Sequence, residues 1–221
     1  SRRSQAAPNV TPTAQSRVTS AVATASSDLE LPSAYDFDGA VALRHNLRMN
    51  LAAADAWRLL RDPQAVAECI PGARLDGPPQ GDLIAGACRV AVGPIHANFQ
   101  GQARFTADDD SRSGRLLGQG RDRLSRTLLA GMLDFTLLED GAAACRLELD
   151  MRYRLSGPLS QFGRPELVRE IAATLLATVG ATLEARVMNP EAKPSAANAV
   201  GGVGLLFSVL MTFIKRGLRL R

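Results

Sequence analysis

Two histidines and three cysteines are the side chains best suited to catalysis or metal binding, and their spacing argues against both. His45 and His96 fall on opposite faces of the strands predicted for them, so they form neither a shared metal site nor part of a catalytic triad. Cys69, Cys88 and Cys145 are far apart, contain no CxxC pair and have no neighbouring histidine. We therefore predict three reduced thiols packed in the interior, no metal site and no catalytic residues.

His45 is the sharpest candidate for recognising a ligand. It shares a predicted inward face with Leu43 and Leu47, where a neutral imidazole could donate a hydrogen bond to a carbonyl group of an apolar ligand. A core histidine bonded to backbone groups is the commoner alternative. Tyr153 is the other polar side chain considered for a pocket, and the two together give only thin support to an enzyme acting on a hydrophobic substrate.

Two further motifs have structural explanations. Asp108-Asp109-Asp110 lacks the glycine and the distal glutamate of a calcium loop, so we predict an exposed turn between strands. Gly118 and Gly120 precede neither a GK[ST] motif nor a helix, which argues against a phosphate-binding loop. We expect these glycines to permit strand bending and to widen the interior.

Hydrophobic periodicity predicts the elements that must position these residues. Residues 41–50 alternate as a half-buried strand, and residues 51–72 have the pattern of two short helices. Residues 82–156 show strand patterns only, and residues 165–187 return to helical spacing. This order predicts an α+β fold, in which an antiparallel sheet of six to seven strands wraps around one long C-terminal helix.

The predicted inward faces define a candidate ligand site made mainly of large apolar side chains. Its members are His45, Leu47, Trp57, Phe99, Phe105, Met132, Phe135, Met151, Tyr153, Leu175 and Val179. Most of these would be core residues in any protein of this pattern. A cavity exists only if the side chains do not fill the space inside the sheet, and the small residues Gly118, Gly120, Gly131 and Ala172 favour such a void.

The net charge of +4 is a property of the C-terminal tail, because residues 1–204 have no net charge. A nucleic-acid binder spreads its cations over a folded face, so we predict no nucleic-acid partner. In residues 203–221, large apolar side chains form one helical stripe and basic side chains lie opposite. The residues expected to touch a membrane are Leu206, Val209, Leu210, Phe213, Ile214, Lys215, Arg216, Leu218 and Arg219.

The tail is predicted to lie in the membrane interface, because its apolar run at residues 200–214 is shorter than the roughly 20 residues that a span needs. Its cations would then face anionic headgroups. The alternative is a helix that packs on the chain's own domain or on a partner protein. We divide the chain into a linker (1–36), a folded hydrophobic-ligand domain (37–188), a second linker (189–202) and the amphipathic tail (203–221).

Three motifs in order resemble a known family. The stretch "AWRLLRDPQAVAECIPGAR" contains Trp57, Asp62-Pro63 and Cys69-Ile70-Pro71-Gly72, and Val92-Gly93-Pro94 and "LSGPLSQFG" (155–163) follow it. Together they resemble the CoxG family of carbon monoxide dehydrogenase subunits, which belongs to the SRPBCC, or START-like, helix-grip superfamily. The resemblance covers about residues 39–187.

The resemblance implies a protein that is not an enzyme and that accompanies a molybdenum-containing hydroxylase such as carbon monoxide dehydrogenase. Its expected role is to link that enzyme to the respiratory membrane by carrying electrons on a bound quinone, either menaquinone or ubiquinone, with no covalent cofactor. The expected location is cytoplasmic and peripheral, on the inner face of the plasma membrane. The alternative is an assembly or membrane-recruitment factor that transports no ligand.

Overall fold

The computed structural model describes residues 31–32, 37–92, 95–162 and 164–189. The predicted amphipathic tail and most of both predicted linkers lie outside these ranges. The described elements, in chain order, are β1 (Val41–Met49), α2 (Ala53–Leu60), α3 (Pro63–Cys69), β2 (Ala73–Leu75), β3 (Leu83–Val92), β4 (Ile95–Asp108), β5 (Ser113–Asp122), β6 (Thr127–Glu139), β7 (Cys145–Ser156), the 3-10 helix η3 (Pro158–Phe162) and α4 (Pro165–Met188).

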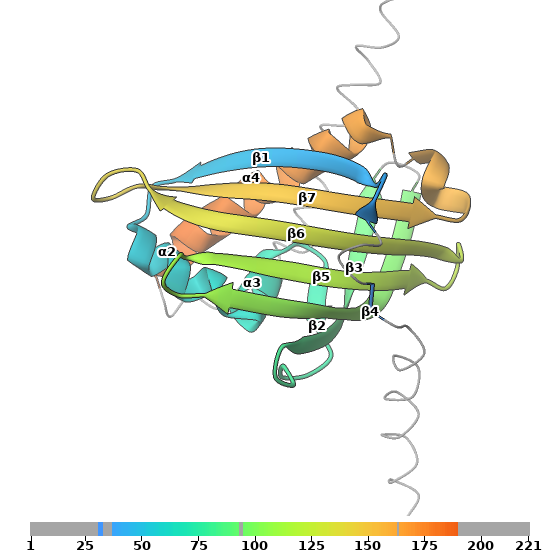
Figure 1. Ribbon diagram of the computed structural model, residues 1–221, viewed down its shortest axis with the longest axis horizontal. Helices are drawn as coiled ribbons and strands as arrows, with labels where there is room; N and C mark the ends of the chain where they lie inside the picture. The colour runs from blue at the N-terminus through green and yellow to red at the C-terminus, as the bar shows by residue number, and fades with distance from the viewer. Residues whose placement is uncertain (1–30, 33–36, 93–94, 163, 190–221) are drawn as a thin grey trace, which may run out of the picture.

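Within the described residues the strands form one seven-stranded antiparallel sheet in the order β1-β7-β6-β5-β4-β3-β2. Strands β2 to β7 follow the chain as a meander, and β1 joins the sheet beside β7. The sheet curls around α4, which lies behind it in Figure 1, and α2 and α3 cover one end. The predicted helix-grip fold is confirmed, with the two short helices after the first strand and the long helix last.

Local signals explain the two short helices. Pro63 occupies the first turn of α3, and the Asp62 side chain accepts a hydrogen bond of 2.9 Å from the Gln64 backbone N–H, which caps the helix. Helix α2 places Trp57 in the interior. The indole Nε1–H of Trp57 donates to Asp109 Oδ1 at 2.9 Å, so the exposed turn predicted at residues 108–110 is tied to α2.

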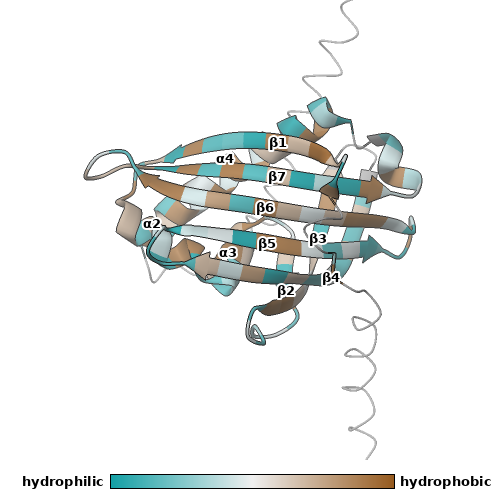
Figure 2. Cartoon of the chain, in the orientation of Figure 1, coloured by the Kyte–Doolittle hydropathy of each residue, from teal (hydrophilic) through white to brown (hydrophobic). Residues whose placement is uncertain are grey.

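Strand register decides which side chains face α4, and it corrects one prediction. Side chains alternate between the two faces, as the hydropathy colouring of the strands illustrates in Figure 2. Phe135 lies on the inner face, where it belongs to the same core cluster as Leu183 of α4. Met132 is three residues away and pairs with Arg152, so it lies on the opposite, outer face, although it is buried there. Its predicted inward position is wrong, because the glycine-interrupted stretch around Gly131 hid the alternation.

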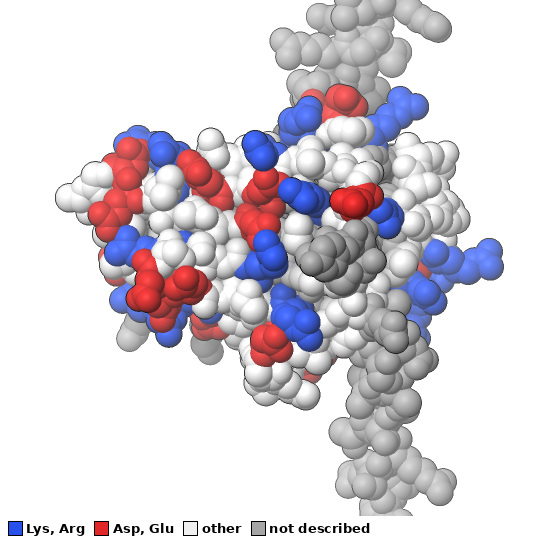
Figure 3. All heavy atoms as spheres, in the orientation of Figure 1, with Lys and Arg blue, Asp and Glu red and all other residues white. Residues whose placement is uncertain are grey.

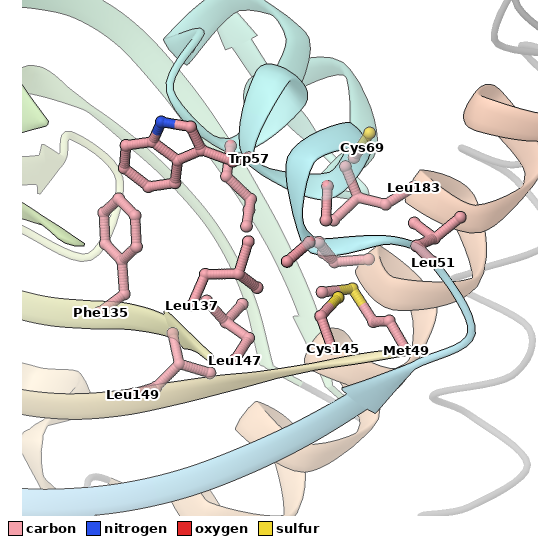
Figure 4. Packing of buried hydrophobic residues seen from close by; sticks show 14 residues of the cluster. Met49, Leu51, Trp57, Cys69, Phe135, Leu137, Cys145, Leu147, Leu149 and Leu183 are labelled. Carbon is pink, nitrogen blue, oxygen red and sulfur yellow. The ribbon is translucent and has the colours of Figure 1, made fainter. Parts of the chain in front are cut away.

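The tightly packed core occupies one end of the molecule, where α2, α3 and the second half of α4 meet the sheet (Figure 4). Its buried members are Met49, Leu51, Ala53, Ala56, Trp57, Leu60, Cys69, Phe135, Leu137, Cys145, Leu147, Leu149, Val179 and Leu183. The remaining inner face of the sheet extends beyond this cluster, toward the start of α4.

Candidate functional site

Beyond the core, the inner face of the sheet carries apolar side chains that the protein only half buries. They are Val41, Phe99, Leu116, Leu129, Met151 and Leu155. Apolar side chains at the centre of a filled core are normally buried almost completely. Leu43 and Tyr153 on the same face are buried, so the apolar surface that the described fold leaves partly uncovered is confined to these half-buried neighbours.

Helix α4 presents matching apolar surface. Within its 24 residues the buried ones are Val179, Gly180 and Leu183, all in the second half, whereas Leu167, Ile171 and Leu175 in the first half are half-buried. Among the described residues, α4 is the one helix long and apolar enough to cross a membrane, and 17% of its apolar window is buried. Length and composition of this kind also occur in core helices, so they do not establish a membrane span. The low burial does distinguish α4 from a fully packed core helix.

Glycines remove side chains from the same part of the inner face. Four of them face one another across β4, β5 and β6, namely Gly101, Gly118, Gly120 and Gly131. A Cβ atom at Gly101 would overlap the carbonyl oxygen of Gln119, so this glycine allows the close approach of β4 and β5. At Gly131 the nearest atom to a Cβ would be the Arg152 carbonyl oxygen at 3.8 Å, an ordinary van der Waals distance, so a side chain would fit at this position.

Two polar side chains lie on the inner face, but at different places. His45 is half-buried opposite Leu149 and has no hydrogen-bond partner within the described part of the chain. Tyr153 is buried on β7 opposite Val41. Val41 precedes His45 on β1 by four residues, so Tyr153 and His45 lie at different places along the sheet. Burial raises the pKa of the Tyr153 hydroxyl, Glu166 raises it further, and Arg169 opposes the shift. The two side chains therefore do not form one catalytic pair.

Comparison with known proteins identifies the fold and the family. The model of the CoxG family, described as a subunit of carbon monoxide dehydrogenase, matches residues 46–188. The chain belongs to the CoxG family. No curated protein matches the chain.

Solved structures share the helix-grip fold of this CoxG domain at low sequence identity. A conserved protein from Geobacillus kaustophilus has a TM-score of 0.59 at 13% identity, covering 67% of this chain and 95% of that one. A protein from Thermus thermophilus has a TM-score of 0.52 at 14% identity, covering 69% of this chain and 100% of that one. The di-domain ARO/CYC BexL from the BE-7585A biosynthetic pathway has a TM-score of 0.51 at 19% identity, covering 68% of this chain and 48% of that one. At these identities the likeness concerns the fold alone.

The candidate residues predicted from the sequence divide between the two ends of the CoxG domain. Trp57, Phe135 and Phe105 form an aromatic cluster with ring centroids 6.2 and 6.1 Å apart, at or against the packed core. Val179 is also part of that core, and Leu47 packs beside Gly180. The half-buried members at the open end are Phe99, Met151 and Leu175.

Sequence reasoning missed several residues of the open end, among them Leu129, Leu155 and Ile171. The inward patterns include Leu155 and Ile171, but a sequence pattern does not separate a filled interior from an open one, so neither was predicted to line the site. Leu129 was missed because Gly131 interrupts its strand pattern. Strand pairing, which sets Leu129 opposite Leu155, would have been the signal.

The cysteines have no features of a reactive site. Cys69 and Cys145 are buried free thiols, as predicted, and Cys88 is half-buried. Burial raises the pKa of all three thiols; for Cys69, Arg186 opposes this increase through its guanidinium, 3.7 Å from Sγ. Thiols with raised pKa values are poor nucleophiles at neutral pH. Among the described residues, no group of three or more His, Cys, Asp or Glu side chains could hold a metal ion.

Proposed function

We propose that this protein is a non-enzymatic accessory subunit that holds a quinone between α4 and the inner face of its sheet. By carrying this quinone, it would link a molybdenum-hydroxylase enzyme of the carbon monoxide dehydrogenase type to the respiratory membrane. One observation carries the proposal. Large apolar side chains on the inner face and on the first half of α4 are only half-buried, beside Gly131, where a side chain would fit without a close contact. Membership of the CoxG family supplies the expected partner enzyme.

The chemistry of this surface favours a quinone over a polar ligand. Sites for apolar ligands have apolar walls and a few polar groups that fix orientation. Leu129, Met151 and Leu175 would contact the ring and isoprenoid tail, and His45 supplies an imidazole that could donate a hydrogen bond to a quinone carbonyl oxygen. The separation of His45 from Tyr153 is why we favour a carrier over an enzyme that converts its ligand.

The membrane link is assigned to residues 203–221, which lie outside the described residues. Their sequence combines an apolar stripe with four cations, each worth on the order of 1 kcal/mol near an anionic surface. Reversible docking on the inner face of the plasma membrane would bring the domain to the bilayer, where menaquinone or ubiquinone dissolves.

The test uses a substitution that fills the proposed site. Gly131→Leu adds a large side chain to the inner face where the quinone is proposed to lie, so we expect bound quinone to fall at least ten-fold. Gly77→Leu is the matched control, because Gly77 is exposed and a Cβ there meets no atom within 4 Å. Quinone is measured by organic extraction and mass spectrometry of protein purified from native membranes, and by titration with a short-chain quinone.

The two variants separate the candidate functions. The carrier function is supported if the wild-type protein and Gly77→Leu contain near-stoichiometric quinone and Gly131→Leu contains none. A wild-type protein that binds its partner enzyme but contains no quinone and takes none up in the titration contradicts the carrier, and favours the recruitment factor. Equal quinone in all three proteins would place the ligand elsewhere.

A further inference from the structure

Ion pairing divides the arginines of the described domain into two groups. Ten of them form salt bridges within the domain: Arg44, Arg48, Arg58, Arg61, Arg74, Arg104, Arg112, Arg115, Arg146 and Arg186. The other eight are exposed and form no salt bridge with any described residue. Three of them, Arg89, Arg152 and Arg154, lie on strands β3 and β7, and Arg154 donates a hydrogen bond to the Asp38 carbonyl oxygen. The remaining five are Arg121, Arg123, Arg126, Arg164 and Arg169. Exposed cations without an internal partner are available to an external anion.

These five arginines lie at one end of the molecule, formed by the β5–β6 turn, η3 and the start of α4. The Leu159 N–H of η3 donates to Thr127 Oγ1 at 3.2 Å, which joins η3 to the beginning of β6. Figure 3 shows acidic side chains gathered toward the left of the view and basic side chains projecting at the right, where Figure 1 places the β5–β6 turn. Among the described residues, the acids at the arginine-rich end are Asp38, Glu166, Glu170 and the buried Asp122.

Leu124 lies within this end and is 93% exposed. It occupies the β5–β6 turn between Arg123 and Arg126. In the described part of the chain, the other large hydrophobic residue with high exposure is Met188, at 79%. An exposed leucine flanked by cations suits a membrane interface, where the apolar side chain enters the headgroup region and the cations meet lipid phosphates.

Buried polar side chains hold this turn in place. Asp122 is 1% exposed, and its carboxylate accepts hydrogen bonds from the Asn98 N–H at 3.0 Å and the Ser125 N–H at 2.7 Å. The Ser125 hydroxyl donates to Thr127 Oγ1 at 2.9 Å. Arg126 completes the turn in the left-handed region, with φ of 57°. The fold therefore fixes a turn that presents Leu124 to solvent.

We propose that this arginine end, defined as Arg121, Arg123, Leu124, Arg126, Arg164 and Arg169, binds the surface of a bilayer that contains anionic phospholipid, with Leu124 inserted among the headgroups. Five exposed arginines exceed the three exposed carboxylates of Asp38, Glu166 and Glu170, and Asp122 is already bonded internally. Charge complementarity and the apolar tip both fit this occupant. The contact is separate from residues 203–221 and would orient the domain on the membrane.

The orientation would place the half-buried apolar surface beside the bilayer, because Leu129 and Leu155 lie near the same end as Leu124. A quinone could then enter with little exposure to water. This last step rests on the proposed function, whereas the membrane contact itself does not.

The first experiment measures partitioning of the full chain onto phosphatidylcholine vesicles with and without phosphatidylglycerol. Leu124→Ser should weaken binding to the anionic vesicles about ten-fold, since one large apolar side chain is lost from the interface. The double variant Arg123→Gln with Arg126→Asn should weaken binding to the anionic vesicles roughly 25-fold, at about five-fold for each cation. Asparagine is used at position 126 because it tolerates the left-handed backbone there. Met188→Ser and Arg58→Gln are matched controls for an exposed apolar residue and an exposed arginine elsewhere, and both should bind as the wild type does.

The second experiment reports insertion directly. Leu124→Trp should show a blue shift of indole emission when anionic vesicles are added, while Met188→Trp should show none; Trp57 is buried and serves as a constant background. No shift at position 124, with wild-type partitioning of Leu124→Ser, overturns the proposal. A loss of binding to the partner enzyme without any change on vesicles also overturns it, and would assign the arginine end to an acidic protein surface.

These outcomes are distinguishable from failure of the proposed function. Quinone content is expected to change in Gly131→Leu and to be retained in Leu124→Ser, because Leu124 is exposed and does not belong to the inner face. A membrane contact with no quinone, or a quinone with no membrane contact, would each refute one proposal and leave the other standing.

Discussion

Single residues in this domain illustrate how buried polar groups are used for architecture. Asp122 is the clearest case, because its carboxylate is nearly inaccessible and bonds to backbone N–H groups of Asn98 and Ser125. Burial would raise the pKa of Asp122, but hydrogen bonds from Ser125 and Asn98 outweigh it and the pKa is lowered. A lowered pKa means that the folded state stabilises the ionised form.

Asp122→Asn should therefore destabilise the domain by about 1–3 kcal/mol near neutral pH, because a charged acceptor is replaced by a neutral one. A carboxyl group with a lowered pKa stabilises the fold above its unfolded-state pKa of about 3.9, and this contribution is lost as the pH falls through the folded-state value. The difference between wild type and variant should shrink below about pH 4. Urea unfolding at several pH values measures it.

Asp110→Asn is the control for this prediction, since Asp110 is exposed in the β4–β5 turn. Equal destabilisation by both variants would mean that general charge, and not the buried carboxylate, is responsible.

The sequence allowed the inward position of His45 and the packed state of Cys69 and Cys145 to be predicted, because each lies in a clear local pattern. It did not indicate the role of Asp122, whose partner Asn98 is on another strand. Met132 was misplaced because Gly131 next to it breaks the alternation of large and small side chains. Local pattern thus fails where glycines replace side chains and where partners are distant.

At the scale of elements, α4 is fixed against β1 by a close contact. A Cβ atom at Gly180 would lie 3.0 Å from a methyl carbon of Leu47. Sequence periodicity predicted the extent of α4 well, since Pro165 begins it and the apolar repeat ends with it. Periodicity could not distinguish Leu175, which is half-buried, from Leu183, which is buried, because burial depends on what lies opposite.

Gly180→Val should push α4 away from β1 and cost about 1–3 kcal/mol through overpacking. Ala181→Val is a matched control, because the adjacent Ala181 is exposed on the same helix. This substitution should lower the stability mainly by the difference in helix propensity between alanine and valine, about 0.5 kcal/mol. Chemical denaturation of both variants measures the difference. If the two variants lose the same stability, the close contact between α4 and β1 contributes nothing specific.

Considered as a whole, the domain has a packed end and an open end. The packed end holds the aromatic cluster around Trp57, whereas the open end has half-buried apolar surface and the arginine end. Composition could not predict this separation, because the charges of residues 1–204 sum to zero. Their distribution emerges only after folding brings Arg123 and Arg164 to one end.

Removing residues 203–221 should leave urea unfolding of the domain unchanged within about 0.5 kcal/mol, if the tail acts on membranes and not as part of the fold. Vesicle binding should fall at least 100-fold, since four cations and several apolar side chains are lost. The remaining binding should depend on Leu124. A large loss of domain stability would instead support the alternative in which the tail packs on its own domain.

The pairing of β1 with β7 also has a consequence for biosynthesis. Residues 41–49 find their sheet partner only in residues 145–153, and α4 follows later still. A growing chain therefore exposes its first strand on the ribosome until nearly the whole domain has emerged, and such non-local contacts slow folding. Nascent chains of this protein should consequently be substrates for co-translational chaperones, and synthesis that stops before α4 should yield a product that aggregates.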